Sequence, residues 1–197
     1  MSACVECARE RAVAITRRSE DAGGYMCARF SRIVHSMSKL LIVYYSLTGG
    51  SRAMVEAAAE GARTETPTIV KRAREANAAD LLNADGYIFA APENLAAIAG
   101  EMKAFYDRTY YDVLGAIEGR PYAQMVCAGS DGENAVRQTA RIATGWRLKT
   151  AQAPIIVCTH AQTKEEILAP KTIGAADLQR CREMGRAMGA GIAMGVF

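Results

Sequence analysis

Apolar runs alternate with amphipathic stretches along most of the chain. Runs rich in branched and aromatic residues predict five strands, at about 39–45, 67–72, 85–91, 121–128 and 153–158. Apolar residues that recur every three or four positions predict helices at about 51–62, 100–115, 132–147 and 175–194, with a short helical turn at 78–83. This alternation indicates βαβ units, and hence an α/β fold with a parallel sheet that helices cover on both faces.

The expected strand order is 2-1-3-4-5, which reverses direction between strands one and three. In open α/β sheets, ligands bind beyond the carboxyl ends of the strands at the point where the order reverses. The turn after strand one and the loop after strand three should therefore face each other across one crevice.

The turn after the first strand carries hydroxyls and glycines and is predicted to bind a phosphate. The apolar run 40–45 ends at Ser46, and Thr48, Gly49, Gly50 and Ser51 follow. The first N–H groups of a helix have no internal partners and the helix dipole is positive there, so an anion is stabilised without a lysine. Ser51 is predicted to cap this helix. The hydroxyls add donors suited to a terminal phosphate monoester, such as that of FMN.

Two other phosphate-binding motifs fit this turn poorly. A nucleotide-hydrolysing P-loop requires a lysine where Ser51 and Arg52 stand, and the dinucleotide fingerprint requires G-x-G-x-x-G. That spacing is nearly met by Gly189, Gly191 and Gly195, but they lie in a helical pattern without a preceding strand and are interpreted as close-packing glycines. For this segment taken alone, an ordinary strand-to-helix turn remains the alternative.

Two further loops follow buried strands. After the third strand come Pro92, Glu93, Asn94, Leu95 and Ala96, and after the fourth come Gly129, Ser130, Asp131 and Gly132. Together with the turn at 46–51, these segments resemble the flavin-binding loops of the flavodoxin-like NAD(P)H-dependent FMN reductases and quinone oxidoreductases, and the resemblance covers about 37–197. Three loops in the family's order are more specific than any one of them.

The resemblance implies a flavodoxin-like three-layer sandwich in which the three loops hold FMN. It implies an enzyme that takes electrons from NADPH or NADH and passes them to a quinone, a flavin or a similar small acceptor. Because the cofactor performs the chemistry, no catalytic side chain and no metal ion are expected. The alternative is an electron-carrier flavodoxin that docks on redox partner proteins. Glu93 beside the flavin is expected to disfavour its anionic reduced form and lower its potential.

Length and charge agree with one enzyme domain. The chain has 197 residues, half of them hydrophobic, which suits a single core. Six of its 24 basic and four of its 21 acidic side chains lie in residues 1–36, which leaves 18 and 17 in the remainder. An electron carrier that steers to basic partners is usually strongly acidic, so this balance favours the enzyme. We expect no nucleic-acid or membrane partner, and the C-terminal helix permits a homo-oligomer.

Residues 1–36 differ from the rest in composition. They contain six arginines, no lysine, Cys4-x-x-Cys7 and no sustained periodicity. The pair Arg17-Arg18 lacks a following apolar run, so an export signal is not expected, and no partner ligands support a zinc or redox role for the two cysteines. We expect this extension to be disordered or to lie upstream of a natural start at Met37. The six scattered cysteines show no disulfide framework, which suits the cytoplasm.

Other conspicuous residues receive structural interpretations. His160 is expected to end the edge strand away from the crevice, and Trp146 is expected to pack rather than stack on a flavin. Cys127, Cys158 and Cys181 are expected to be small buried hydrophobes. Tyr106, Tyr110 and Tyr111 could line an apolar pocket for the electron acceptor, although core packing is the stronger interpretation for Tyr106.

Overall fold

The computed structural model describes residues 38–197, and the predictions for residues 1–36 lie outside that range. Its strands are β1 (Leu40–Tyr44), β2 (Thr68–Arg72), β3 (Gly86–Asn94), β4 (Ala97–Ile98), β5 (Pro121–Ala128), β6 (Lys149–Thr150) and β7 (Ile155–Cys158). Its helices are α1 (Gly50–Arg63), α2 (Ala78–Leu82), α3 (Gly100–Val113), α4 (Glu133–Gly145), α5 (Lys164–Leu168) and α6 (Ala175–Met194). Helix α5 was not predicted. Within the described range, no helix has the length and hydrophobicity to cross a bilayer.

The central sheet has the order β2-β1-β3-β5, with β6 and β7 both paired to the far side of β5. All of these pairings are parallel, so the predicted order 2-1-3-4-5 is confirmed. The prediction of five strands was too low, because the sheet has seven. One extra strand is β4, which returns antiparallel to the end of β3.

The other extra strand is β6, which lies before the predicted fifth strand at 153–158, so that two short strands form the edge beside β5. Pro121 and Tyr122 at the start of β5 pair with β6, whereas the second half of β5, from Met125, pairs with β7. Pro154 lies directly before β7 and has no N–H to donate to a ladder, so the edge strand resumes only at Ile155. The apolar run at 153–158 therefore predicted β7 but not β6.

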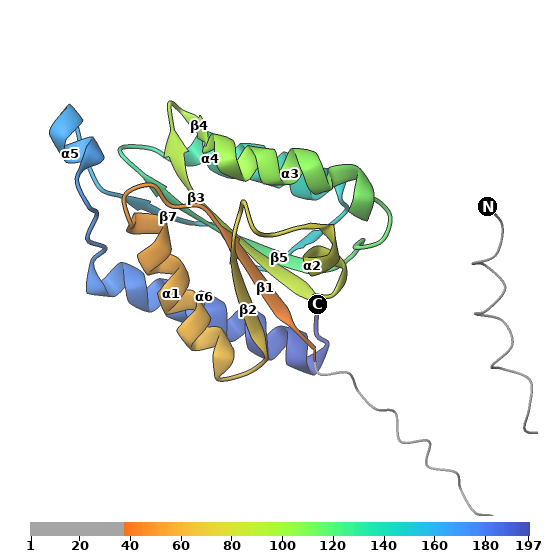
Figure 1. The fold of residues 1–197 in the computed structure, drawn as a ribbon. Helices are drawn as coiled ribbons and strands as arrows, with labels where there is room; N and C mark the ends of the chain where they lie inside the picture. The colour runs from red at the N-terminus through yellow and green to blue at the C-terminus, as the bar shows by residue number, and fades with distance from the viewer. Residues whose placement is uncertain (1–37) are drawn as a thin grey trace, which may run out of the picture. The chain divides into compact units, whose positions relative to one another are not determined.

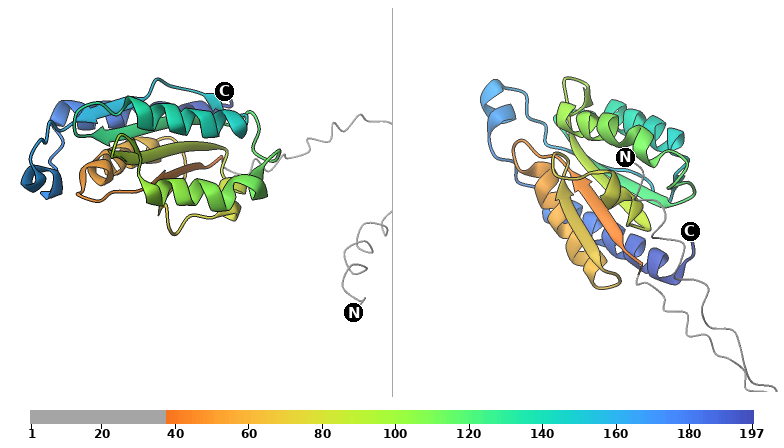
Figure 2. Two further views of the ribbon diagram at one scale, coloured as in Figure 1. Left: turned by 90° about the horizontal axis from the view of Figure 1, so that it is seen from above. Right: turned by 45° about the vertical axis from the view of Figure 1, so that its right-hand side comes forward.

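Helices cover both faces of the sheet, as predicted (Figures 1 and 2). One face packs against α1 and α6 through Met54, Val55, Cys181, Met184 and Met188. The other packs against α2, α3 and α4 through a core that includes Leu81, Met102, Phe105, Tyr106, Ala135 and Ala143. Aromatic rings dominate this second core, where Phe89 contacts the rings of Tyr106, Tyr122 and Trp146.

Glycines allow α1 and α6 to pack at very short range. A Cβ atom at Gly185 would overlap the carbonyl oxygen of Ala58, and a Cβ at Gly61 would overlap that of Arg182. Gly189 similarly lies against the backbone of Ala62. The close-packing interpretation therefore holds for Gly189, whereas Gly195 is the C-cap of α6 with a φ of 64°. This contact fixes α1 against the sheet.

Replacing Gly185 by alanine should destabilise the protein. The added methyl meets backbone that cannot move aside, so the free energy of unfolding should fall by about 1–3 kcal/mol even though alanine favours a helix. Chemical denaturation measures this change. The control is Gly100→Ala at the start of α3, where a Cβ meets no atom within 4 Å and stability should change by less than about 1 kcal/mol. Equal effects of the two substitutions would contradict the packing argument.

Candidate functional site

The turn between β1 and α1 is shaped by a hydroxyl and a left-handed glycine. Gly49 is the N-cap of α1 with a φ of 94°, a conformation that favours glycine. Its N–H donates to Ser46 Oγ at 3.1 Å. The prediction that Ser51 caps the helix was therefore wrong, because α1 begins one residue earlier, at Gly50, and Ser51 lies inside the first turn.

Ser51 occupies an unusual position for a hydroxyl. Its side chain is only 2% exposed, and Oγ has no hydrogen-bond partner within the described residues. Across the same range, no acceptor is found for the backbone N–H groups of Gly50 and Ser51. A buried unpaired hydroxyl is costly, typically about 1–3 kcal/mol. A phosphate oxygen at this helix N-terminus would give these groups an acceptor, so the residues present fit a phosphate group.

The second loop is a tight hairpin rather than an irregular segment. Glu93 and Asn94 of β3 pair with Ile98 and Ala97 of β4, so Leu95 and Ala96 alone form the connection. Both have positive φ, 52° and 57°, as a two-residue turn of this type requires. Asparagine and glycine usually fill such positions, so this turn carries backbone strain. Side chains of α4 hold it in place: Asn134 Nδ2 donates to the Ala96 carbonyl, and Gln138 Oε1 accepts from the Ile98 N–H.

The third loop is joined to the second through Glu93. The Gly132 N–H donates to Glu93 Oε2 at 2.9 Å, while Oε1 is buried without a partner. Gly132 is the N-cap of α4, with a φ of 86°. On its other side the third loop is tied to the chain beyond β7, because the His160 N–H donates to the Gly129 carbonyl at 2.8 Å. The Glu93 carboxylate therefore fixes the spacing of two loops through a contact between residues 39 positions apart in the chain.

One pocket brings the three loops together beyond the carboxyl ends of the strands. Its enclosed volume is about 80 Å³, and its lining is mainly apolar. Of the predicted site residues, Thr48, Pro92, Glu93, Asn94 and Gly129 line it. Ser46 and Gly49 line a second cavity, which shares Leu47 with this pocket. Gly50 and Ser51 are buried behind the turn, and Leu95, Ala96, Ser130, Asp131 and Gly132 shape the loops without lining the pocket.

The pocket also contains residues that the sequence patterns did not indicate. They are Leu47, Cys127, Ala128, Thr159, Ala161, Ile167 and Lys171, the last four from the connection between β7 and α6. This connection contains α5, whose capping box joins Thr163 and Glu166. The T-x-x-E spacing at 163–166 is a known start signal and could have revealed the helix.

Lys171 fastens this connection onto the turn at 46–51. Its N–H donates to the Thr48 carbonyl at 2.8 Å, and its ammonium donates to carbonyls at the end of α5, including those of Ile167 and Ala169. A Cβ at Gly50 would meet both Lys171 and the Cys127 sulfur. The sequence predicted an anion site without a lysine, whereas the fold places one beside it.

The thiols at this end of the sheet are not activated. Burial raises the pKa of Cys127, with Lys171 partly opposing the rise. Burial and the carboxylates of Asp131 and Glu93 raise the pKa of Cys158. Both groups therefore stay protonated at neutral pH, which disfavours a thiolate nucleophile. Cys158 is only partly buried, contrary to prediction, because it is the last residue of β7 and its S–H points to the Ser130 carbonyl.

The remaining conspicuous residues of the sequence are a tryptophan, three tyrosines and a histidine. Trp146 is buried and donates to the Tyr110 carbonyl, as the packing interpretation predicted. Tyr106 is also buried, as the core-packing interpretation predicted, and Tyr110 stacks on Trp146. None of the three tyrosines lines this pocket, and a role for them beside an electron acceptor stays a prediction. Their helix runs away from the strand ends. His160 lies two residues beyond β7, is exposed and also stays outside the pocket.

Replacing Ala96 by glycine should stabilise the protein. Glycine adopts positive φ without a Cβ penalty, so the free energy of unfolding should rise by about 1 kcal/mol. The matched control is Ala97→Gly in β4, where φ is not positive and the substitution should lower stability. Denaturant titration of both variants measures the difference, and a loss of stability in Ala96→Gly would show that the turn is unstrained.

Comparisons with known structures agree with the fold. A flavodoxin from an archaeon superposes with a TM-score of 0.64 at 18% identity, covering 78% of this chain and 98% of the other. A WrbA-like flavodoxin from Agrobacterium tumefaciens gives 0.62 at 18% identity, covering 80% and 98%. At these identities the likeness concerns the fold alone.

Sequence comparisons give closer relatives. A flavodoxin of Aquifex aeolicus is 38% identical over 86 residues, 43% of this chain and 46% of that protein. An NAD(P)H dehydrogenase (quinone) of Acidithiobacillus ferrooxidans is 37% identical over 95 residues, 37% of this chain and 48% of that protein. The chain thus spans about half the length of the curated relatives that it matches. The model of the NADPH-dependent FMN reductases matches residues 57–163, more than half of the chain. The chain therefore belongs to the NADPH-dependent FMN reductase family.

Proposed function

We propose that this protein holds FMN at the pocket beyond the strand ends and catalyses electron transfer from NADPH or NADH to a quinone, a flavin or a similar small acceptor. The observation that carries the proposal is the pairing of that pocket, lined by all three predicted loops, with a buried Ser51 hydroxyl that lacks an acceptor. FMN supplies the redox chemistry when bound. The role of the chain is to bind, to orient and to exclude water.

The phosphate end of the ligand belongs at the start of α1. The N–H groups of Gly50 and Ser51, the Ser51 hydroxyl and the Thr48 hydroxyl are the donors, and the positive end of the α1 dipole favours the anion. Lys171 adds a positive charge beside the same turn. Charge-assisted hydrogen bonds of this kind are stronger than neutral ones.

The flavin ring belongs between the second and third loops. Pro92, Glu93 and Asn94 line the pocket from the second loop, and Gly129 lines it from the third. The hydrogen bond between Glu93 and Gly132 holds the two loops at a fixed separation. Leu47 and Ile167, which are about half exposed or more, add apolar surface at the mouth. Apolar surface around the ring suits an apolar acceptor such as a quinone.

A second candidate function is electron transfer between proteins, as in a flavodoxin. The identity to the Aquifex flavodoxin over 86 residues favours it. The near balance of 18 basic and 17 acidic residues outside positions 1–36 favours the reductase, because carriers rely on charge to steer to their partners. The free cysteines among the described residues suit a reducing, cytoplasmic location, and a homo-oligomer is compatible with either function.

Replacing Ser51 by alanine should separate ligand binding from folding. FMN affinity should fall by about 1–3 kcal/mol because a charged hydrogen bond is lost. The ligand-free protein should be as stable as the wild type or more stable, since the variant removes a buried hydroxyl without a partner. Titration of apoprotein with FMN and denaturation without FMN measure the two effects.

The matched control is Thr144→Ala on α4, whose hydroxyl is exposed and donates within its own helix to Ala140. It should leave FMN affinity unchanged. If Ser51→Ala keeps full FMN affinity, the phosphate does not lie at the start of α1.

The reductase proposal is tested with FMN-loaded protein in the absence of oxygen. Adding NADPH or NADH should remove the visible absorbance of the oxidised flavin within minutes, and adding a quinone should restore it. Stopped-flow absorbance follows both steps. If neither nicotinamide bleaches the flavin while dithionite does, the reductase proposal is wrong and the carrier function is favoured.

A further inference from the structure

The outer edge of β4 is bonded by side chains rather than by another strand. Among the described strands, β4 pairs with β3 alone. On its other side the Ile98 N–H donates to Gln138 Oε1 at 2.8 Å, and the Ala96 carbonyl accepts from Asn134 Nδ2. Figure 1 shows this hairpin beside α4. An open strand edge presents unpaired N–H and C=O groups, so the two amides of α4 take the place of a further strand.

The two amides match the hairpin in spacing. Asn134 and Gln138 are four residues apart on α4, so they lie one above the other on the same face of the helix. Four residues of helix rise about 6 Å. Their partners, at Ala96 and Ile98, are two residues apart, and two residues of extended chain span about 6.6 Å. The two contacts therefore run in step along α4 and the hairpin.

The orientation of each amide is dictated by the chemistry of its partner. Ile98 offers an N–H, so Gln138 presents its oxygen. The oxygen of Asn134 accepts from Arg137 Nη2 at 2.6 Å, and a guanidinium has donors only. The NH₂ group of Asn134 is thereby left to face the Ala96 carbonyl. One amide acts as an acceptor and the other as a donor, so the two are not interchangeable.

The hairpin depends on such external contacts. Leu95 and Ala96 at its tip have positive φ, and Leu95 is fully exposed, so burial does not offset the strain. Its ladder comprises two residue pairs, and an isolated hairpin is at best marginally stable in water. Glu93 is bonded to Gly132 at the base, which leaves the tip and β4 to the two amides. Since Glu93 and Asn94 line the flavin pocket, the position of the hairpin sets the shape of that pocket.

We propose that Asn134 and Gln138 are positioning residues for the flavin, and that they hold the hairpin at 93–98 in its binding conformation before FMN arrives. The inference rests on the FMN-binding part of the proposed function. Neither side chain lines the pocket, so both act through the hairpin. A wall that is already in place costs no ordering when the ligand binds. If only a fraction of the molecules hold it in place, the apparent affinity falls by that fraction.

The first test measures the hairpin in the full chain without FMN. Hydrogen exchange of the segment 92–99 is followed by mass spectrometry in the wild type, Asn134→Asp and Gln138→Glu. Both changes replace an amide by a carboxylate of the same size on one face of α4. Gln138→Glu keeps an acceptor for Ile98 and should leave the exchange rate within about threefold. Asn134→Asp loses the donor to Ala96 and should raise the rate about 10-fold or more.

The same experiment separates positioning from a general effect on the helix. Asn134 is the second residue of α4, and a negative charge in the first turn of a helix is stabilising. Exchange of the α4 amides should therefore be as slow in Asn134→Asp as in the wild type, while the hairpin loosens. Faster exchange throughout α4 would assign the effect to the helix and overturn the proposal.

The second test measures FMN affinity by fluorescence quenching during titration of the apoprotein. Asn134→Asp should bind FMN about 5- to 100-fold more weakly, and Gln138→Glu should stay within about threefold of the wild type. Gln138→Met keeps the size of the side chain without the acceptor and should resemble Asn134→Asp. Equal losses in the two carboxylate variants would assign the effect to the added charge and overturn the proposal. Full affinity in both Asn134→Asp and Gln138→Met would also overturn it.

The first control repeats the glutamine substitution on another helix. Gln179 lies on α6, is exposed and donates to Glu183 within the same helix. Gln179→Met should leave both the hairpin exchange and the FMN affinity within about twofold, since it removes only an exposed contact on the helix surface.

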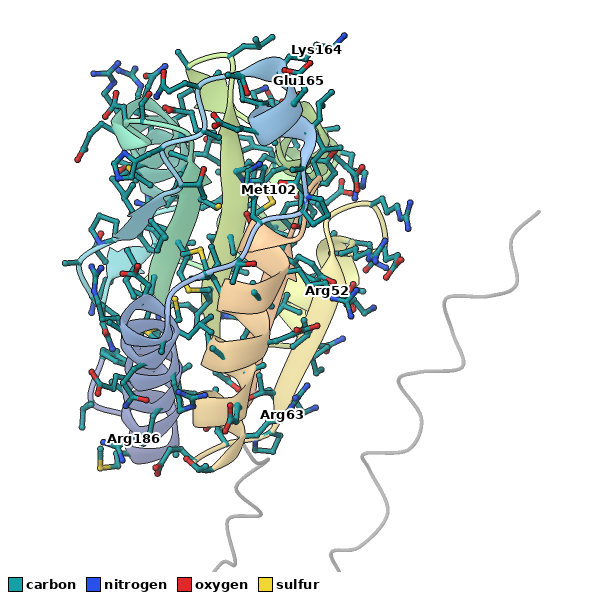
Figure 3. All side chains as sticks on the ribbon, turned by 90° about the vertical axis from the view of Figure 1, so that its left-hand side faces the viewer. Arg52, Arg63, Met102, Lys164, Glu165 and Arg186 are labelled. Carbon is teal, nitrogen blue, oxygen red and sulfur yellow. The ribbon has the colours of Figure 1, made fainter. Side chains whose placement is uncertain are left out.

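The second control lowers stability far from the pocket. The buried Thr66 hydroxyl donates to the Ser38 carbonyl at 2.5 Å, and Thr66 follows α1, which ends at Arg63. Figure 3 shows Arg63 at the opposite end of the fold from Lys164 and Glu165 of α5. Thr66→Val should lower global stability and leave FMN affinity within about twofold. A loss of affinity as large as that of Asn134→Asp would show that stability alone sets the affinity, and would overturn the proposal.

The outcomes also separate this inference from the reductase function. If the FMN affinities follow the expected order but neither nicotinamide reduces the bound flavin, the positioning role is supported and the reductase function fails. If the hairpin of the ligand-free wild type exchanges as fast as an unfolded chain, α4 does not hold it, and the positioning role is overturned whatever the nicotinamides do.

Discussion

The burial of β1 between two strands and two helical layers is the constraint on which the site depends. Leu40 to Val43 are completely inaccessible, and β1 pairs on both sides, with β2 and with β3. A strand in this position cannot slide, because a shift of one residue would turn every side chain to the opposite face. Its carboxyl end is therefore fixed, and the turn at 46–51 lies at the point where the strand order reverses.

Close backbone packing extends this constraint to α1. At Gly61, Gly185 and Gly189 the absence of a side chain lets the backbones of α1 and α6 come into direct contact. A helix held by its backbone has little freedom to rotate, so its first-turn N–H groups keep one direction. Preorganised donors cost little to order when a ligand arrives, and this is the main source of their strength.

Several groups at this end of the sheet lower the stability of the folded protein. Leu95 and Ala96 hold positive φ, Ser51 keeps a buried hydroxyl without a partner, and Glu93 keeps one buried oxygen in the same state. Two more buried oxygens without a partner among the described residues, Tyr106 Oη and Gln124 Oε1, lie in the core beneath α3 and α4 rather than at the pocket. Such costs persist where the surrounding structure over-determines them, as it does for these three loops.

The sequence by itself determined the fold class, the strand order and the order of the loops. Uniform apolar runs such as 40–45 are typical of buried parallel strands, and the glycines and hydroxyls that end them mark turns. The strands β4 and β6 were not predicted, because they have two residues each and carry no periodic signal. Only the tertiary structure brought Lys171 to the turn at 46–51 and linked Glu93 to Gly132. Periodicity reports which residues are buried within one element, whereas these contacts join residues on different elements, and their distances exist only once the sheet is assembled.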